Sequence, residues 1–266
     1  MTSDLKQKHR AMWASGEYDA IARGIRSVAD HLVRVARIRA GERVLDVACG
    51  TGNTALVARA RGADVTALDL TPELLAVAEQ RAAREQLGGI AWTPGDAEAL
   101  PFPDASFDVV TSSCGLMFAP DQRKVASELA RVTKRGGRVA IQAWTREGGL
   151  GKFFALTARH VPPPPGLASP FEWGDEAAVR RLLGGAFGAF EFERYDCPEF
   201  GEAPEQIADL FIGRYGPTHR AHASLAPDKA AAYRADFIEF LRGYVCAADG
   251  KVRWGREYLI TVATRS

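Results

Sequence analysis

Two kinds of apolar spacing alternate along the first half of the chain. From Ile21 to Val35, apolar residues recur every three or four positions, which predicts one buried face of a helix that ends before Gly41. The short apolar run Arg43–Val47 predicts a buried strand instead, and the glycine turn Ala48–Gly52 follows it. A helix that leads into a strand and a glycine turn is thus the first predicted unit.

Predicted strands and helices continue to alternate up to residue 143. A helix is expected from Thr71 to the Gly88–Gly89 pair, with Thr71 as its cap and Pro72 at its first position, where proline is favoured. The other expected helices are Thr54–Ala60 and Gln122–Val132, and the expected strands after the first are Asp64–Leu68, Ile90–Thr93, Phe107–Ser112 and Arg138–Ala143. Such alternation predicts parallel βαβ units with right-handed crossovers.

The second half of the chain has a less regular pattern. Gly213–Thr218 is expected to be a loop, and Pro162–Pro165 a stiff stretch within one. The remaining expected elements are a short helix from Asp175 to near Gly184, a strand at Phe190–Tyr195, helices at Pro204–Ile212 and Pro227–Val245, and a closing strand at Tyr258–Thr264.

Composition and charge narrow the class of protein. The 266 residues are 47% hydrophobic and carry a formal net charge of +1, which is typical of a globular domain and gives no general attraction to nucleic acid or anionic lipid. No apolar run reaches the length of a membrane span, and the polar N-terminus lacks a secretory pattern. The four cysteines have no metal-binding spacing, so we expect reduced thiols, no metal site and a cytoplasmic location.

Candidate chemistry lies in the segment Val44-Leu-Asp-Val-Ala-Cys-Gly-Thr-Gly-Asn53. Asp46 stands near the end of a buried strand, and Gly50 and Gly52 let the backbone pass close to a ligand before a helix begins. Asp69 ends the second predicted strand, where an acid can accept hydrogen bonds from both hydroxyls of a ribose. These residues indicate a nucleotide-like ligand.

Two ligands fit these residues, and charge favours one of them. Gly50–Ala55 also matches the weak dinucleotide pattern GxGxx(G/A). However, a pyrophosphate is anionic and would be repelled by Asp46, whereas S-adenosylmethionine presents an ammonium and a sulfonium to that carboxylate.

Four ordered segments together resemble the motifs of class I S-adenosylmethionine-dependent methyltransferases, closest to the ubiquinone/menaquinone C-methyltransferase-like group. After the glycine turn come Asp69-Leu70, then Gly95-Asp-Ala97 with Leu100–Pro103 and Phe107–Val109, and finally Leu129–Arg138. The resemblance covers roughly residues 40–145. Ala48 stands where many relatives have a glycine.

The resemblance implies an α/β, Rossmann-like fold with a seven-stranded, mostly parallel sheet, helices on both faces and an antiparallel final strand. Residues 1–40 would form a helical lid, residues 41–145 the cofactor-binding core, and residues 146–266 the rest of the fold with a helical acceptor-binding insertion at about 204–249. It also implies that Asp96 accepts from the adenine amino group while Ala97 offers its backbone N–H. The expected S-adenosyl-L-methionine site comprises Tyr18, Asp46, Ala48, Cys49, Gly50, Gly52, Asp69, Leu70, Asp96, Ala97 and Ser113.

The acceptor is less defined by the sequence. The sulfonium is already an activated leaving group, so positioning can supply most of the acceleration and no catalytic residue is predicted. Cys114, Met117 and Phe118 follow the fourth strand and are candidates for the methyl channel, with ordinary packing as the alternative. Aromatic residues in the N-terminal segment and in the predicted insertion indicate a small apolar or aromatic acceptor. It would be held between Trp13 and Tyr18 on one side and Phe211 and Tyr215 on the other.

Other functions remain as alternatives. A nicotinamide-dependent oxidoreductase or a non-catalytic cofactor-binding regulator could share the glycine turn, although Asp96 argues against the first. A nucleic-acid methyltransferase is disfavoured because Ser112–Pro120 lacks the Asn/Asp-Pro-Pro-aromatic motif and no basic stripe is visible. Monomer and homodimer both stay open.

Overall fold

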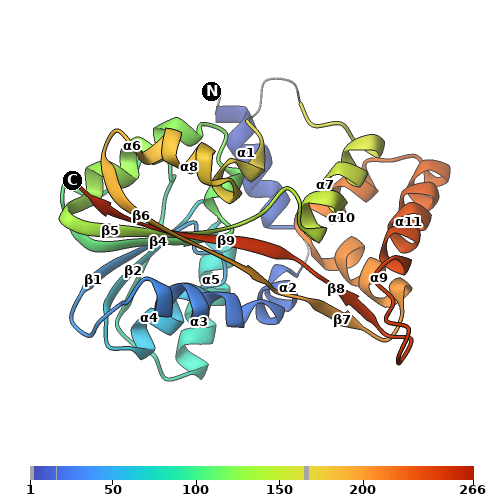
Figure 1. Ribbon diagram of the computed structural model, residues 1–266, viewed down its shortest axis with the longest axis horizontal. Helices are drawn as coiled ribbons and strands as arrows, with labels where there is room; N and C mark the ends of the chain where they lie inside the picture. The colour runs from blue at the N-terminus through green and yellow to red at the C-terminus, as the bar shows by residue number, and fades with distance from the viewer. Residues whose placement is uncertain (1–2, 16, 165–167) are drawn as a thin grey trace.

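The computed structural model describes residues 3–15, 17–164 and 168–266, and its centre is a seven-stranded sheet in the order β3-β2-β1-β4-β5-β9-β6 (Figure 1). The strands are β1 (Arg43–Val47), β2 (Asp64–Asp69), β3 (Ile90–Pro94), β4 (Phe107–Ser113), β5 (Thr133–Trp144), β6 (Phe187–Asp196) and β9 (Glu257–Arg265). Strands β1 to β5 pair in parallel, and β9 is antiparallel to both of its neighbours. The expected α/β fold and its antiparallel final strand are confirmed.

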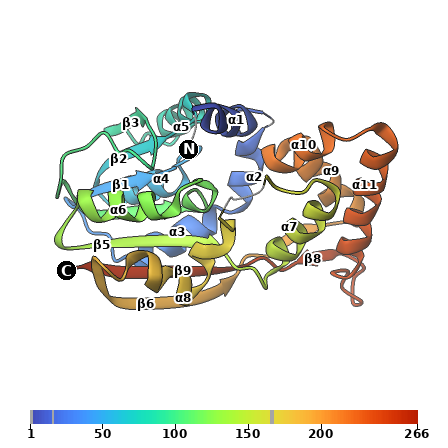
Figure 2. The same ribbon diagram turned by 90° about the horizontal axis from the view of Figure 1, so that it is seen from above.

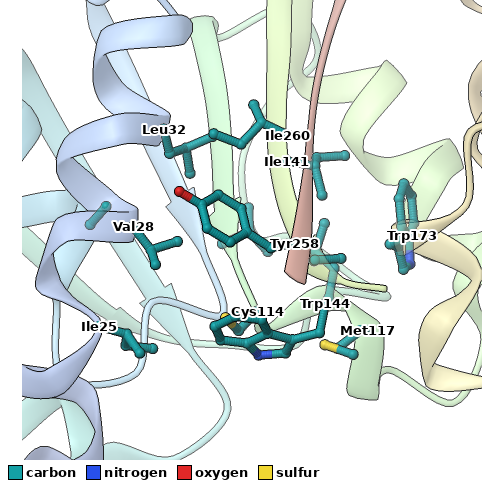
Figure 3. Packing of buried hydrophobic residues seen from close by; sticks show 14 of the residues in the cluster. Ile25, Val28, Leu32, Cys114, Met117, Ile141, Trp144, Trp173, Tyr258 and Ile260 are labelled. Atoms are coloured by element: carbon teal, nitrogen blue, oxygen red, sulfur yellow. The ribbon is translucent and has the colours of Figure 1, made fainter. Parts of the chain in front are cut away.

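Helices cover both faces of this sheet. Figure 1 shows α3 (Arg26–Val35) and α4 (Asn53–Ala60) on one face, and α6 (Gln122–Val132) and α8 (Glu176–Leu183) on the other. Helix α5 (Pro72–Arg84) packs beside β2 and β3. The first face buries the apolar stripe predicted from the sequence: in Figure 3, Val28 and Leu32 point from α3 toward Tyr258 and Ile260 of the sheet.

The remaining helices gather beyond the carboxyl ends of the parallel strands, from the centre to the right of Figures 1 and 2. They are α1 (Ser3–Trp13), α2 (Tyr18–Gly24), α7 (Gly149–His160), α9 (Pro204–Arg214), α10 (Gly216–Ala223) and α11 (Pro227–Arg242), with the small sheet β7 (Glu199–Gly201) and β8 (Val252–Trp254) beside them. Two short 3₁₀ turns, η1 (Leu116–Phe118) and η2 (Pro170–Gly174), complete the fold. Among the helices of the described ranges, none is long and apolar enough to cross a membrane.

Three local predictions were wrong. The single helix expected over Ile21–Val35 is divided at Ile25, which ends α2 and begins α3. Strand β5 starts at Thr133 rather than Arg138, because Gly136 and Gly137 form an irregularity inside the strand instead of a turn before it.

The loop expected at Gly213–Thr218 is largely helical, with α9 continuing to Arg214 and α10 starting at Gly216. Proline in the first turn of α10 suits a helix start. A Cβ at Gly216 would lie 2.6 Å from the carbonyl oxygen of Met12, so the glycine permits close packing of α10 against α1. The predicted stiff stretch at Pro162–Pro165 ends at a residue outside the described ranges.

Candidate active site

A large cavity opens at the carboxyl ends of β1, β2, β4 and β5, which is where open α/β sheets bind ligands. It encloses about 1160 Å³, with the open space at its mouth included. Of the eleven residues expected to bind the cofactor, the following nine line it: Tyr18, Ala48, Cys49, Gly50, Asp69, Leu70, Asp96, Ala97 and Ser113. Residues far apart in sequence therefore form one wall, while Asp46 and Gly52 lie elsewhere.

The glycine turn after β1 has three residues in left-handed backbone conformations. The φ angles are 53° at Ala48, 55° at Gly50 and 85° at Gly52. A Cβ at Gly50 would lie 3.3 Å from the Tyr18 ring, on the cavity side. A Cβ at Gly52 would lie 3.0 Å from Trp92 and 3.1 Å from Ala78, so this glycine permits close packing of the turn against β3 and α5.

Replacement of Ala48 by glycine is expected to stabilise the protein by up to about 1 kcal/mol. The left-handed conformation costs a residue with a Cβ about 1–2 kcal/mol, and the extra freedom of glycine in the unfolded chain offsets about 0.4–1 kcal/mol of the gain. Chemical denaturation measures the difference. Ala58→Gly, inside α4, is the matched control and should destabilise by about 1 kcal/mol or more. Equal losses in both variants would contradict the strain at Ala48.

Asp69 connects the glycine turn to the start of α5. Its Oδ2 accepts from the backbone N–H of Gly50 at 2.7 Å, and its Oδ1 accepts from that of Thr71 at 2.8 Å. The side chain is 7% exposed and lines the cavity. Burial raises the pKa of the Asp69 carboxyl, while these hydrogen bonds oppose the rise. A fixed carboxylate at this place can accept hydrogen bonds from ligand hydroxyls.

Asp46 lines a smaller neighbouring cavity of about 300 Å³. Tyr18, Cys49 and Ser113 line both cavities, so the two are adjacent. The Asp46 carboxylate accepts from Thr111 Oγ1 at 2.9 Å and from the Ala55 N–H at 3.1 Å. Burial raises the pKa of Asp46 to about 7, because desolvation outweighs these hydrogen bonds.

Arg81 of α5 stabilises the glycine turn after β1, and it was not among the residues predicted from the sequence. It is 5% exposed, donates to the Thr51 carbonyl oxygen and to Asn53 Oδ1 at 2.8 Å each, and forms an ion pair with Asp19 of α2. An arginine within the apolar stripe of α5 was the one available indication in the sequence.

Helix α1 closes over the segment that contains Asp96. Lys6 of α1 forms an ion pair with Asp96 Oδ2 and another with Glu98 Oε2, the second at 2.6 Å. Asp96 Oδ1 accepts from the Glu98 N–H at 2.9 Å. Lys6 lines the cavity beside Asp96 and was also missed, because no local pattern pairs a lysine with a carboxylate 90 residues away.

Aromatic residues cluster in the cavity wall and reach the glycine turn through Tyr18. The Trp13 ring centroid lies 5.4 Å from that of Tyr18, 4.9 Å from that of Phe118 and 6.0 Å from that of Tyr215. Cys114, Phe118 and Phe211 also line the cavity. Met117, a candidate for the methyl channel, instead belongs to the buried core, where Figure 3 shows it near Trp144.

The comparisons with known proteins identify the family. Residues 45–141 match the methyltransferase domain family. The chain is 40% identical to the uncharacterised protein Rv1403c of Mycobacterium tuberculosis, over 97% of this chain and 94% of that protein. It is 34% identical to a demethylmenaquinone methyltransferase of Thermus thermophilus, over 63% of this chain and 73% of that protein.

A solved structure has the same fold. The YcgJ protein of Bacillus subtilis superimposes with a TM-score of 0.63 at 23% identity, covering 89% of this chain and 97% of that one. These matches do not favour a nicotinamide-dependent oxidoreductase or a non-catalytic regulator. The chain therefore belongs to the S-adenosylmethionine-dependent methyltransferases and is an enzyme that takes its methyl group from S-adenosylmethionine.

Proposed function

We propose that the enzyme methylates a small, largely apolar or aromatic molecule, bound between the N-terminal segment and the helical insertion. The observation that carries this proposal is the aromatic wall formed by Trp13, Tyr18, Phe118 and Tyr215, which come from three separate parts of the chain. Apolar and aromatic walls with a few polar groups are typical of small-molecule sites. A protein of net charge +1 has no general attraction for RNA or DNA.

We further infer that the nine lining residues with Asp46 hold the cofactor. Asp69 would accept hydrogen bonds from the ribose hydroxyls, Asp96 from the adenine amino group, and Ala97 would offer its backbone N–H to the ring. Asp46, in the adjoining cavity, would favour the ammonium end. The structure fits this assignment because Gly50 leaves space beside Tyr18 that a Cβ would fill. When bound, S-adenosylmethionine supplies an activated methyl group on its sulfonium.

The residues of the chain would accelerate transfer by positioning the acceptor and excluding water. Burial raises the pKa of the Tyr18 and Tyr215 hydroxyls, so both stay protonated at neutral pH and neither is ready to act as a general base. They can instead donate hydrogen bonds. An acceptor whose reacting atom has a free electron pair at neutral pH suits such a site.

Within residues 1–40 we assign the lid role to α1 and α2, because α3 covers a face of the sheet. Residues 41–145 would be the cofactor-binding core, and residues 146–266 the remainder, with the acceptor-binding insertion at about 204–249. Trp13 of α1, Phe211 of α9 and Tyr215 between α9 and α10 line the cavity, which supports the lid and insertion roles. All four cysteines are free thiols, which supports a cytoplasmic location.

Replacement of Trp13 by alanine is expected to lower methyl transfer about 10-fold or more while S-adenosylhomocysteine affinity changes by less than about 3-fold, since Trp13 excludes water and orients the acceptor. Turnover is measured against a panel of phenols, amines and quinols, and affinity by calorimetry. Deletion of residues 1–16 should likewise cause loss of turnover with only a modest loss of S-adenosylhomocysteine affinity.

Arg10→Ala is the matched control on α1, because among the described residues Arg10 pairs only with the exposed Glu73. Its turnover should remain within about 2-fold of the wild type, as expected for an exposed ion pair. Full activity of the Trp13 and deletion variants, or methylation of tRNA but of no small molecule, would contradict the proposed lid and acceptor.

A further inference from the structure

Arg256 is a buried charge in the wall of the cavity. It lies between β8 and β9, is 2% exposed, and lines the cavity together with Trp144, Leu150 and Phe211. Burial of a guanidinium is costly unless its donors and its charge are matched. Its partners therefore indicate whether the side chain is fully used by the fold.

The described residues provide acceptors for only some of the N–H donors of this guanidinium. Nε donates to the Cys197 carbonyl oxygen at 3.0 Å, and Nη1 forms an ion pair with Glu199 Oε2 at 2.8 Å. Among the described residues, Nη2 has only the Cys197 sulfur as an acceptor, a weak one, at 3.7 Å. A guanidinium has five N–H donors, so one hydrogen on each Nη has no acceptor among the residues that the structure describes.

The surroundings of Arg256 hold the guanidinium in place. Its carbon lies 5.6 Å from the Trp144 ring centroid and 5.9 Å from that of Trp254, within the range of cation–π attraction. Two aromatic faces and the Cys197 carbonyl oxygen thus fix the plane of the fork. A fixed, planar fork is the geometry that binds a carboxylate through two parallel hydrogen bonds.

Two tyrosine side chains line the cavity, and Tyr215 is the one that lies close to Arg256. Tyr18 and Tyr215 both line it, and neither hydroxyl makes a hydrogen bond to the described residues. Tyr215 lies close enough to Arg256 for the positive charge to oppose the rise that burial causes in its pKa, and close enough to Tyr18 for the two to interact. A phenol donor beside a guanidinium can complete the coordination of an oxyanion.

Charge distinguishes the two ends of the cavity. The charged residues beside the expected adenosine, Lys6, Asp69 and Asp96, have partners or roles in the proposed cofactor site. Beyond them, Arg256 is the one arginine, lysine or carboxylate among the described residues that line the cavity. A single arginine, already paired with Glu199, suits a monoanion better than a phosphate dianion.

We propose that Arg256, assisted by Tyr215, binds a carboxylate of the acceptor, which makes the substrate an apolar or aromatic carboxylic acid. This inference rests on the proposed function, because it places the acceptor in the same cavity. The apolar walls would hold the body of the acid, and the arginine would select acids over neutral molecules of the same shape. Arg256 is then a specificity-determining residue.

The test compares acids with their neutral amides. Benzoate, cinnamate and octanoate are titrated against the full chain with S-adenosylhomocysteine present, alongside benzamide, cinnamamide and octanamide. The wild type should bind its best acid about 10-fold or more tightly than the matching amide, and Arg256→Met should reduce this ratio to about 2-fold or less, because the charge-assisted bonds are lost. S-adenosylhomocysteine affinity should stay unchanged.

A second variant, Glu199→Gln, tests the same site if Arg256→Met fails to fold. This variant retains the arginine and frees it from its carboxylate partner, so acids should bind about 3-fold or more tightly while amide binding is unchanged. A role of Arg256 in folding alone predicts no gain. Tyr215→Phe should weaken acids and leave amides unaffected.

The outcomes separate this inference from the proposed function. If S-adenosylhomocysteine binds but no acid is preferred over its amide, the carboxylate site is wrong and the proposed function stands. A preference for acids that persists in Arg256→Met also overturns the assignment to Arg256. If S-adenosylhomocysteine does not bind, the proposed function fails, and the same acid–amide comparison without it still decides the role of Arg256.

Discussion

Replacement of Asp69 by alanine is expected to weaken S-adenosylhomocysteine binding by about 1.5–3 kcal/mol, or roughly 10- to 150-fold in the dissociation constant. Two losses contribute to this effect. The carboxylate would no longer accept from the ribose hydroxyls, and it would no longer hold the Gly50 and Thr71 N–H groups. Isothermal titration calorimetry with purified full-length protein measures the change.

Asp64→Ala is the matched control for Asp69, because Asp64 begins the same strand and is exposed at its opposite end. Its affinity should equal that of the wild type. Folding of both variants is compared by circular dichroism, so that loss of the site is distinguished from loss of structure. Unchanged affinity of Asp69→Ala, or tight binding of NADH by the wild type with no binding of S-adenosylhomocysteine, would defeat the assignment of Asp69.

Replacement of Phe237 by alanine is expected to lower the free energy of unfolding by about 3–5 kcal/mol, the usual cost of removing a buried phenylalanine. Phe237 of α11 is fully buried and stacks on Phe153 of α7, with ring centroids 4.0 Å apart. Its ring also packs against Phe211 and Trp254. This cluster connects α7, α9, α11 and β8, so the substitution leaves a cavity at the centre of the helical group.

Phe237→Ala should affect acceptor turnover more than cofactor binding. Phe211 both belongs to the cluster and lines the active-site cavity, so acceptor turnover should fall with stability. The cofactor-binding residues lie on the sheet edge, so S-adenosylhomocysteine affinity should persist below the unfolding transition. Phe240→Ala, on the same helix but only partly buried, is the control and should cost about 1–2 kcal/mol. Equal losses in the two variants would contradict this account of the cluster.

The sequence alone determined the alternation of strands and helices in the first half of the chain, although not every boundary. Strand Arg43–Val47 and helix Gln122–Val132 were predicted with the bounds that the structure has. Both are governed by local rules: a buried strand is a short apolar run between turn residues, and the helix has the 3.6-residue apolar period behind the capping residue Asp121. The motif spacing likewise indicated the residues that the sheet edge brings together at the cavity, since parallel strands end at one edge.

Elements whose stability depends on distant contacts could not be predicted. Helix α1 has a mostly polar sequence, so its own pattern did not predict its bounds, and only the resemblance implied a helical lid there. Its apolar contacts, such as Trp13 with Phe118 and Tyr215, come from remote parts of the chain. Helix α7 and the pair β7–β8 were missed for the same reason. Intrinsic preferences are small compared with the free energy of burial, so tertiary packing decides such segments.

Tertiary structure alone also decided the charged part of the site. Lys6 forms an ion pair with Asp96, which is 90 positions away in the sequence. Arg256, which follows β8, forms one with Glu199 of β7. Neither pairing leaves a periodic trace, because a single long side chain can be matched by any carboxylate that the fold brings near it. The sequence thus determined the cofactor-binding edge through short-range backbone requirements, whereas the closure over the cavity and the charge on its far wall depend on contacts that exist only in the folded chain.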